Sequence, residues 1–300
     1  MTEQGHTFIQ NMLYLTIVSI IWAFSFGIIG NSLLGVDSFL VATLRLAFAS
    51  LIFLPFLRLK YIQCIDGLKL FIYGFVQFGL MYVCYMKAYQ YLPSHLVALF
   101  SIFTPIYVVV INDIRKRQFS VQYLMAALLS IIGAAVIKVQ GLPSGDFWTG
   151  FVLMQIAGIA FAFGQIAYRD WKHTHTSVPD SAIFALLTLG GTLCAGLFSL
   201  ALADKASLAI TSTQWLSILY LGLVASGLGF FLWNKGATKT NPGTLAAFNN
   251  AVVPLAMLFS LFIFDEIDQI KLEQFIRLAI GGLLIASAVL FTTQPNKSIN

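Results

Sequence analysis

The chain has 300 residues, of which 59% are hydrophobic and 10% are charged, and its formal net charge is +5. A soluble domain carries about 25% charged residues, so this composition excludes a soluble globular protein and indicates one whose partner is the lipid bilayer. The basic residues are dispersed among short connectors, which argues against a nucleic-acid partner. The three cysteines lack metal-ligand spacing, so neither a zinc site nor a disulfide framework is expected.

Ten apolar runs are long enough to cross a bilayer, which takes about 20 residues per helix. The N-terminal segment lacks Lys and Arg, and no small-residue cleavage pattern follows the first run, so we expect that run to be retained as a span. The connectors are short and leave no room for an extramembrane domain. The predicted spans are 12–30, 38–57, 68–88, 94–112, 121–140, 147–169, 181–203, 214–234, 244–263 and 273–292.

The basic residues predict the orientation of these spans. Connectors on the side of the N-terminus, with their flanks, hold eleven Lys and Arg, whereas the other side holds five. Short cytoplasmic connectors carry an excess of Lys and Arg. We therefore expect both termini in the cytoplasm of a bacterium, with the chain in the inner membrane.

Two long stretches, 76–105 and 224–254, resemble each other when one extra residue is allowed in the second. Five predicted spans in each half force the second copy to insert upside down relative to the first. Such inverted repeats, expected here at 12–140 and 147–292, are typical of alternating-access carriers with a substrate site between the halves. The matched polar and turn residues are Lys87, Pro93 and Pro105 in the first copy and Lys235, Pro242 and Pro254 in the second.

Several motifs carry a resemblance to a known family. With "IIWAFSFG" in the first span and "LRLAFASLIFLPFLR" through the second, the chain resembles EamA-type carriers of the drug/metabolite transporter superfamily. The resemblance implies an all-α membrane protein with ten transmembrane helices in two inverted five-helix repeats, and a transporter without cofactor, not an enzyme. "FWTGFVLMQ" and "GTLAAFNNAVVP" are similar to the biotin carriers of the enterobacterial inner membrane, which implies uptake of biotin or a related carboxylate. Fold alone does not choose the substrate, so an exporter of amino acids or amphipathic metabolites or drugs stays open.

Arg45 is the one charged residue well inside a predicted span. A charge there costs about 3 kcal/mol or more and usually faces a cavity or a partner. Two interpretations remain open: Arg45 holds a substrate carboxylate by paired hydrogen bonds, or it has a structural role, in which it snorkels toward the membrane surface or binds carbonyls at a helix end.

Side chains that are mostly aromatic form two matched stripes, one in the third span and one in the eighth. At helical spacing, each set of three falls on one helix face. These stripes are interpreted either as packing or as the walls of a midplane pocket, with Trp22 heading the matching face of the first span. The stripes are Phe78, Tyr82 and Tyr85, and Ser226, Phe230 and Trp233.

Amide side chains within the spans are further candidates, because an unpaired amide is costly in lipid. Asn249, Asn250, Gln77, Gln155 and Gln165 either make interhelical hydrogen bonds or bind a substrate amide or ureido group. Our hypothesis combines the candidates. Arg45 binds the carboxylate of biotin, Asn249, Asn250 and Gln77 bind its ureido ring, and Trp22, Tyr82, Phe230 and Trp233 pack against its thioether bicycle.

Lys87 and Lys235 end the third and eighth spans on opposite sides, and we interpret them as topological anchors or gating residues. Acidic residues avoid the middle of every span, which argues against a buried carboxylate relay for protons. The histidines have no carboxylate or thiol at ligand spacing, so no metal site is expected, and no catalytic constellation is found. We expect a monomer or a weak dimer.

Overall fold

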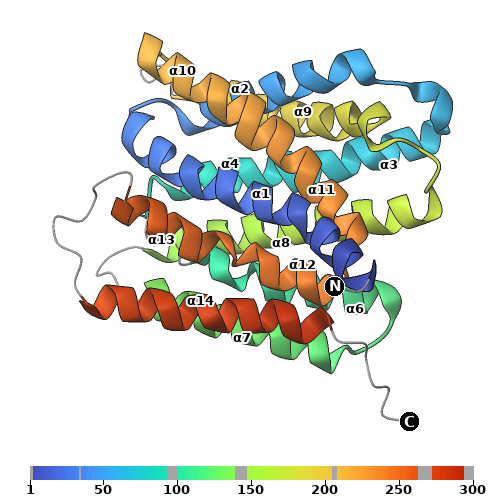
Figure 1. Ribbon diagram of the computed structural model, residues 1–300. Coiled ribbons are helices and arrows are strands. Elements are labelled where there is room, and N and C mark those ends of the chain that lie inside the picture. The colour runs from blue at the N-terminus through green and yellow to red at the C-terminus, as the bar shows by residue number, and fades with distance from the viewer. Residues whose placement is uncertain are drawn as a thin grey trace.

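The computed structural model describes residues 3–33, 35–92, 97, 100–138, 147–204, 208–262 and 272–293, and these residues contain helices but no strand (Figure 1). Residues 94–96, 98–99, 139–140 and 263 of the predicted spans lie outside this part. The helices are α1 Glu3–Ser32, α2 Ser38–Phe53, α3 Cys64–Gly74, α4 Met81–Ala88, α6 Thr104–Lys116, α7 Val121–Lys138, α8 Phe147–Thr174, α9 Phe184–Leu202, α10 Ser212–Tyr220, α11 Gly229–Lys239, α12 Pro242–Asn249, α13 Val252–Phe262 and α14 Leu272–Thr293. Short 3-10 turns lie at Leu54–Phe56, Leu59–Tyr61, Ser101–Phe103 (η4) and Asp180–Ala182.

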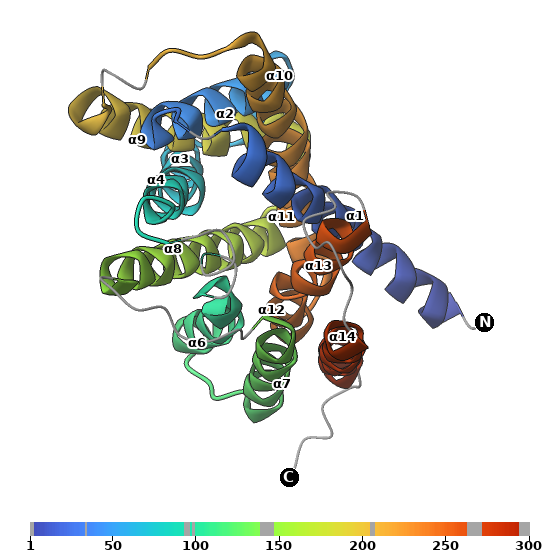
Figure 2. The same ribbon diagram turned by 90° about the vertical axis from the view of Figure 1, so that its left-hand side faces the viewer.

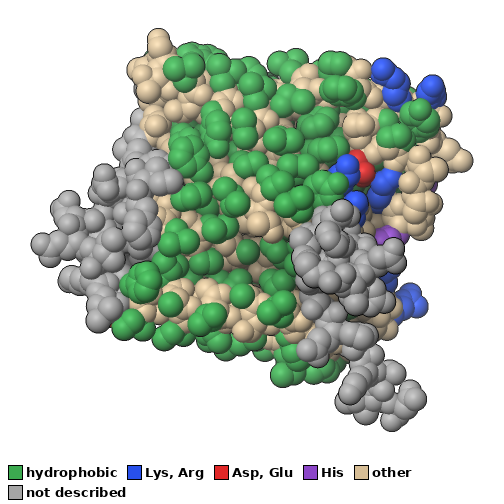
Figure 3. Space-filling view, viewed as in Figure 1, with side chains coloured by type: hydrophobic (Ala, Val, Ile, Leu, Met, Phe, Trp, Pro, Cys, Tyr) green, Lys and Arg blue, Asp and Glu red, His purple; other side chains and the backbone are tan. Residues whose placement is uncertain are grey.

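The outer surface of the bundle is apolar, as a lipid-facing surface must be. Many large apolar side chains are exposed on it; among them, Leu200 is 90% exposed and Phe119 is 75% exposed. Figure 3 shows hydrophobic side chains over most of one face, with Lys and Arg gathered at the end near the N-terminus. Six helical segments of the described residues are long and apolar enough to cross a membrane: Ser38–Phe56, Cys64–Ala88, Phe147–Thr174, Phe184–Leu202, Ser212–Lys239 and Phe275–Thr292. The predicted all-α membrane class is confirmed.

The helices pack into two groups joined by two central helices. In the first group, α2 and α9 pack together. Helix α9 contacts α3 and the segment that continues from it, and α2 contacts α10 and the segment that continues from it. In the second group, α7 packs along α14, and α12 contacts α6, α7 and α14. Helices α1 and α8 contact members of both groups, and Figure 2 shows α8 between α4 above and α6 below. Since each group mixes helices from both halves of the sequence, the halves are interleaved and are not two separate bodies.

Two rods of the first group, each a continuous run of helical segments, contain a π-helical segment midway along their length. Phe75–Leu80 (η3) joins α3 to α4, and Leu221–Leu228 (η7) joins α10 to α11. A π-helical turn bonds each N–H to the carbonyl five residues earlier, and such widened turns are frequent at functional sites. The Ser226 Oγ atom donates to the Leu221 carbonyl at 2.8 Å and supports the widened turn in η7. The 3.6-residue spacing of the sequence gave no sign of either segment.

Helical segments of the second group also contain irregular turns. The 3-10 turn η4 precedes α6, and the chain between α12 and α13 turns at Asn250, whose N–H donates to the Ala247 carbonyl at 3.1 Å. Asn241 caps the start of α12, where its side chain accepts from the Thr244 N–H at 2.8 Å. Interrupted helices of this kind bring polar backbone and side chains to the midplane of a carrier.

Close contact between α7 and α14 depends on two glycines. A Cβ atom at Gly281 would lie 2.4 Å from the Gly133 carbonyl oxygen, and one at Gly133 would lie 2.7 Å from the Gly281 oxygen. Small residues allow helix backbones to approach within a membrane, where dispersion contacts drive association. Gly282, the next residue, has the Pro254 Cβ at 4.0 Å and therefore has room for a methyl group.

The variant Gly281→Ala should destabilise the protein by about 1–3 kcal/mol, because the added methyl group forces the two helices apart. In contrast, Gly282→Ala should be neutral or stabilising by up to about 1 kcal/mol, because alanine has the higher helix propensity. Unfolding of both variants in detergent, followed by tryptophan fluorescence, makes the comparison. Equal stability of the two variants would contradict the close packing of α7 on α14.

Candidate functional site

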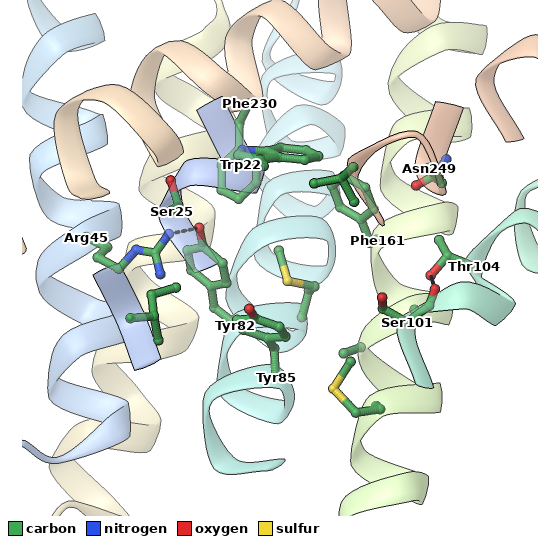
Figure 4. A pocket seen from close by; sticks show the side chains of 16 residues that line it. Trp22, Ser25, Arg45, Tyr82, Tyr85, Ser101, Thr104, Phe161, Phe230 and Asn249 are labelled. Carbon is green, nitrogen blue, oxygen red and sulfur yellow. Dashed lines mark hydrogen bonds between the residues drawn. The ribbon is translucent and has the colours of Figure 1, made fainter. Parts of the chain in front are cut away.

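A cavity of about 150 Å³ lies between the two helix groups, lined by residues of α1, α2, α4, α6, α8, α11, α12 and α13 (Figure 4). One water molecule needs about 10–15 Å³ in the same measure, so this cavity has room for several waters or for a small metabolite. Its lining is mostly apolar, with polar groups gathered at two places. This pattern is typical of small-molecule sites, in which a few polar groups orient the ligand.

The first polar place is built around Arg45, which is 3% exposed. Its Nη2 atom donates to the Tyr82 hydroxyl at 2.6 Å and its Nε atom donates to Ser226 Oγ at 3.3 Å. The Tyr82 and Ser226 hydroxyls are 3.0 Å apart, and the Ser226 proton goes to the Leu221 carbonyl. Tyr82 therefore donates to Ser226, and a chain of bonds from α2 to η7 orients the guanidinium group.

The Arg45 guanidinium keeps unused hydrogen-bonding capacity. Its Nη1 atom is buried and has no hydrogen-bond partner among the described residues. Across the same residues, none of the ion pairs includes Arg45. A buried cation without a carboxylate is costly in lipid, and an anionic ligand that binds Nη1 would relieve that cost.

Aromatic rings form the wall between the two polar places. The Trp22 indole N–H donates to the Ala225 carbonyl of η7 at 2.9 Å, which fixes the ring. Phe161 and Phe230 each meet Trp22 edge to face, with centroids 5.8 Å apart. Phe230 also lies 5.4 Å from the Tyr82 ring. The wall combines large apolar faces with fixed geometry, which suits a rigid apolar ring in the ligand.

The second polar place consists of Ser101, Thr104 and Asn249, which Figure 4 shows across the cavity from Arg45. Thr104 Oγ1 donates to the Ser101 carbonyl at 2.8 Å, and Asn249 Nδ2 donates to the Leu245 carbonyl at 2.8 Å. The Thr104 hydroxyl oxygen keeps acceptor capacity and Asn249 keeps a second amide proton, so the pair suits a ligand that both donates and accepts. Gly158 keeps this place open, since a Cβ there would lie 3.2 Å from Thr104 Oγ1.

The structure places six of the predicted site residues on the cavity and two directly behind it. Arg45, Trp22, Tyr82, Phe230 and Asn249 line it, as does Tyr85, whose hydroxyl is 2.9 Å from that of Tyr89. Ser226 orients Arg45 from behind, and Trp233 stacks on Trp22 with centroids 4.8 Å apart.

Other predicted residues make contacts outside the cavity lining. Gln77 pairs with Asn234, and its Nε2 atom donates to Asn234 Oδ1 at 2.8 Å. Asn250 Nδ2 donates to the Ile102 carbonyl at 3.1 Å and to Ser130 Oγ at 3.3 Å. Gln155 Oε1 accepts from the Tyr107 hydroxyl at 2.7 Å, and Gln165 Oε1 accepts from the Trp233 indole at 2.9 Å. These amides join helical segments, as the alternative of interhelical hydrogen bonds predicts.

The two matched lysines lie away from the cavity lining. Lys87 Nζ is 5.4 Å from the centroid of the Phe39 ring. Lys235 Nζ is 5.2 Å from the Tyr14 ring and 5.8 Å from the Phe231 ring. Cation–π contacts of this kind fit anchoring of a long side chain at a helix end.

Sequence reasoning missed Ser101, Thr104 and Asn234. Small hydroxyl residues are common in membrane helices, so their types gave no signal. Ser101 could have been noticed as the repeat partner of Asn250. In the described part of the chain, no group of three His, Cys, Asp or Glu residues is placed to hold a metal ion.

Comparison with known proteins decides the family. The EamA-like transporter family matches residues 10–139 and 144–294. The chain belongs to this family. It is therefore a transporter and not an enzyme.

Individual relatives agree with this assignment. A protein of Pseudomonas aeruginosa named "Probable biotin transporter" is 36% identical over 93% of this chain and 96% of its own length. The "Biotin transporter" of Escherichia coli K12 is 38% identical over 85% of each chain. A crystal structure that is 16% identical superposes with a TM-score of 0.75, covers 95% of this chain and 97% of its own, and shows the fold alone.

The two adjacent asparagines should respond differently to leucine. Asn250→Leu should lower the free energy of unfolding by about 1–3 kcal/mol, because the buried Ile102 carbonyl and Ser130 hydroxyl lose a partner. Asn249→Leu should change it by less than about 0.5 kcal/mol, because Asn249 bonds its own helix and faces the cavity. Thermal and denaturant unfolding in detergent measure both. A larger loss of stability in Asn249→Leu would contradict this assignment.

Proposed function

We propose that this transporter takes up biotin by alternating access. The observation that carries the proposal is the free cationic Nη1 of Arg45 at one end of an aromatic cavity that has amide and hydroxyl groups at the other. Biotin has the matching order of groups: a carboxylate, an aliphatic chain, a thioether bicycle and a ureido ring. The names of the relatives from Pseudomonas and Escherichia support the same substrate.

The binding mode follows from the positions of the side chains. Arg45 binds the carboxylate through Nη1, and Tyr82 and Ser226 hold the guanidinium in place. The rings of Trp22 and Phe230 pack against the bicycle. The ureido group forms hydrogen bonds with Asn249, Ser101 and Thr104. This assignment replaces Gln77 and Asn250 of the sequence-based hypothesis with the two hydroxyl residues of the cavity.

The architecture that we propose has ten spans in two inverted repeats, 12–140 and 147–292, with both termini in the cytoplasm of a bacterial inner membrane. Support comes from the π-helical segments η3 and η7, which occupy corresponding positions of the two halves. The interruptions at η4 and between α12 and α13 also correspond. Because the halves are interleaved, the moving bodies are mixed groups of helices and not the repeats themselves. We further propose a monomer or a weak dimer.

Uptake of an anion needs a source of energy. Moving one negative charge inward against a potential of about 100 mV, inside negative, costs about 2.3 kcal/mol. A co-transported cation or metabolic trapping of biotin inside the cell would supply this. Uptake measured with and without an imposed potential separates the two sources.

Uptake of labelled biotin into a biotin-requiring bacterium that lacks its own transporter tests the proposal. Expression of this chain should raise uptake well above the empty-vector background and restore growth on low biotin. No uptake above background would overturn the biotin proposal. Raised efflux of amino acids or amphipathic compounds in the same cells would instead favour an exporter.

Arg45→Gln should lower biotin uptake by about 10–150-fold, since a hydrogen bond to a charged group contributes about 1.5–3 kcal/mol and tenfold corresponds to about 1.4 kcal/mol. Arg58→Gln is the matched control, because Arg58 is exposed and donates to the carbonyls of Pro55 and Leu57. Biotin amide, which lacks the negative charge, should compete poorly with biotin in the wild type. Equal uptake by the Arg45 and Arg58 variants would refute the role of Arg45.

A further inference from the structure

A layer of buried amides lies next to the cavity, on the side where α1 begins and α11 ends. Gln77, Gln165 and Asn234 are each 0% exposed. Each lies four residues along the same helical run from a cavity residue. Gln77 precedes Met81, whereas Gln165 and Asn234 follow Phe161 and Phe230. Four residues are about 6 Å of helix rise, so three separate rods place an amide at one level, one turn from the cavity.

The amides of this layer join the rods through side chains. Gln77 and Asn234 exchange both of their hydrogen bonds, at 2.8 and 3.2 Å, between η3 and α11. The Trp233 indole donates to Gln165 Oε1 at 2.9 Å, and Trp233 stacks on Trp22 of the cavity wall. The layer therefore ties η3, α8 and α11 together between the cavity and the end of the bundle where α1 begins.

Amides are a costly choice if this layer never opens. Leucine pairs would fill the same volume without burying polar groups, and a net gain from an interhelical hydrogen bond in a membrane averages only about 0.6 kcal/mol. An amide pair has an advantage where the same positions are wet in another state, because water replaces its hydrogen bonds. The Gln165 Nε2 atom adds a second observation, since it is buried without a partner among the described residues.

We propose that the Gln77–Asn234 amide pair, backed by Gln165 and Trp233, is the gate on this side of the cavity. The pair separates and becomes hydrated when the substrate leaves toward that side, and it re-forms when the cavity faces the other side. The inference rests on alternating access from the proposed function, but it does not depend on which substrate is carried. It makes Gln77 and Asn234 gating residues that do not contact the substrate in the closed state.

Cysteine accessibility tests the gate. Gln77→Cys and Asn234→Cys are made in a background without Cys64, Cys84 and Cys194, and the purified variants in liposomes are treated with a water-soluble methanethiosulfonate. Thr188→Cys is the control, because Thr188 is also 0% exposed and bonds only within its own helix among the described residues. Both gate cysteines should react at least about tenfold faster than the control, since local opening exposes them.

The outcomes separate the gate from the substrate proposal. Faster labelling that biotin further changes supports both. Faster labelling on which biotin has no effect supports the gate and counts against biotin. Gate cysteines as inert as Thr188→Cys overturn the gate, and biotin uptake by the same preparation would leave the proposed function standing.

Paired substitutions provide a second, functional test. Gln77→Leu with Asn234→Leu should keep biotin binding, measured by quenching of Trp fluorescence, within about threefold, but should lower uptake at least about tenfold because the apolar pair resists hydration. The exchange Gln77→Asn with Asn234→Gln keeps both amides and should recover most of the uptake. A leucine pair that transports as fast as the exchanged pair would overturn the gate.

Discussion

A polar group inside a bilayer has no water to bind, so its partner must come from the protein. This constraint organises the interior of the bundle. Arg45 bonds Ser226, Gln77 bonds Asn234, and Asn250 bonds the Ile102 carbonyl. Each of these bonds joins the first half of the chain to the second. Because lipid provides no hydrophobic force between helices, such bonds and close glycine contacts hold the interleaved halves together.

Buried polar atoms without a hydrogen-bond partner mark the positions where the protein alone does not satisfy its interior. Five such side-chain atoms are found within the described residues, and two of them, Arg45 Nη1 and Gln165 Nε2, belong to the cavity and to the amide layer next to it. The first belongs to a cavity residue and the second lies one turn beyond the cavity. A native structure rarely leaves such groups unsatisfied unless a ligand or another conformation completes them. In the two proposals made above, an anionic ligand binds the first atom and a second, hydrated state satisfies the other.

Much of the candidate site could be predicted from the helical spacing of its residues and from the energetic cost of placing polar groups in a membrane. Arg45 stood out because a charge in mid-span needs a reason, and the stripe with Tyr82 and Tyr85 stood out because of its helical period. The same reasoning could not distinguish Asn249, which lines the cavity, from Asn250, which joins helices. Adjacent residues on a helix point about 100° apart, and the turn at Asn250 changes that direction again. The π-helical segments likewise shift the register that a 3.6-residue period assumes.

The sequence by itself determined that the chain is a helical membrane protein, that it belongs to a carrier family, and that a few polar residues must be buried. These conclusions depend on composition, run length and motifs, which are properties of the chain in order. Only the tertiary structure decided which buried polar residues face the cavity, that Gln77 meets Asn234, and that Ser101 and Thr104 line the same cavity as Arg45. Those facts depend on which helices are neighbours in space, and an apolar helix in lipid carries little information about its neighbours.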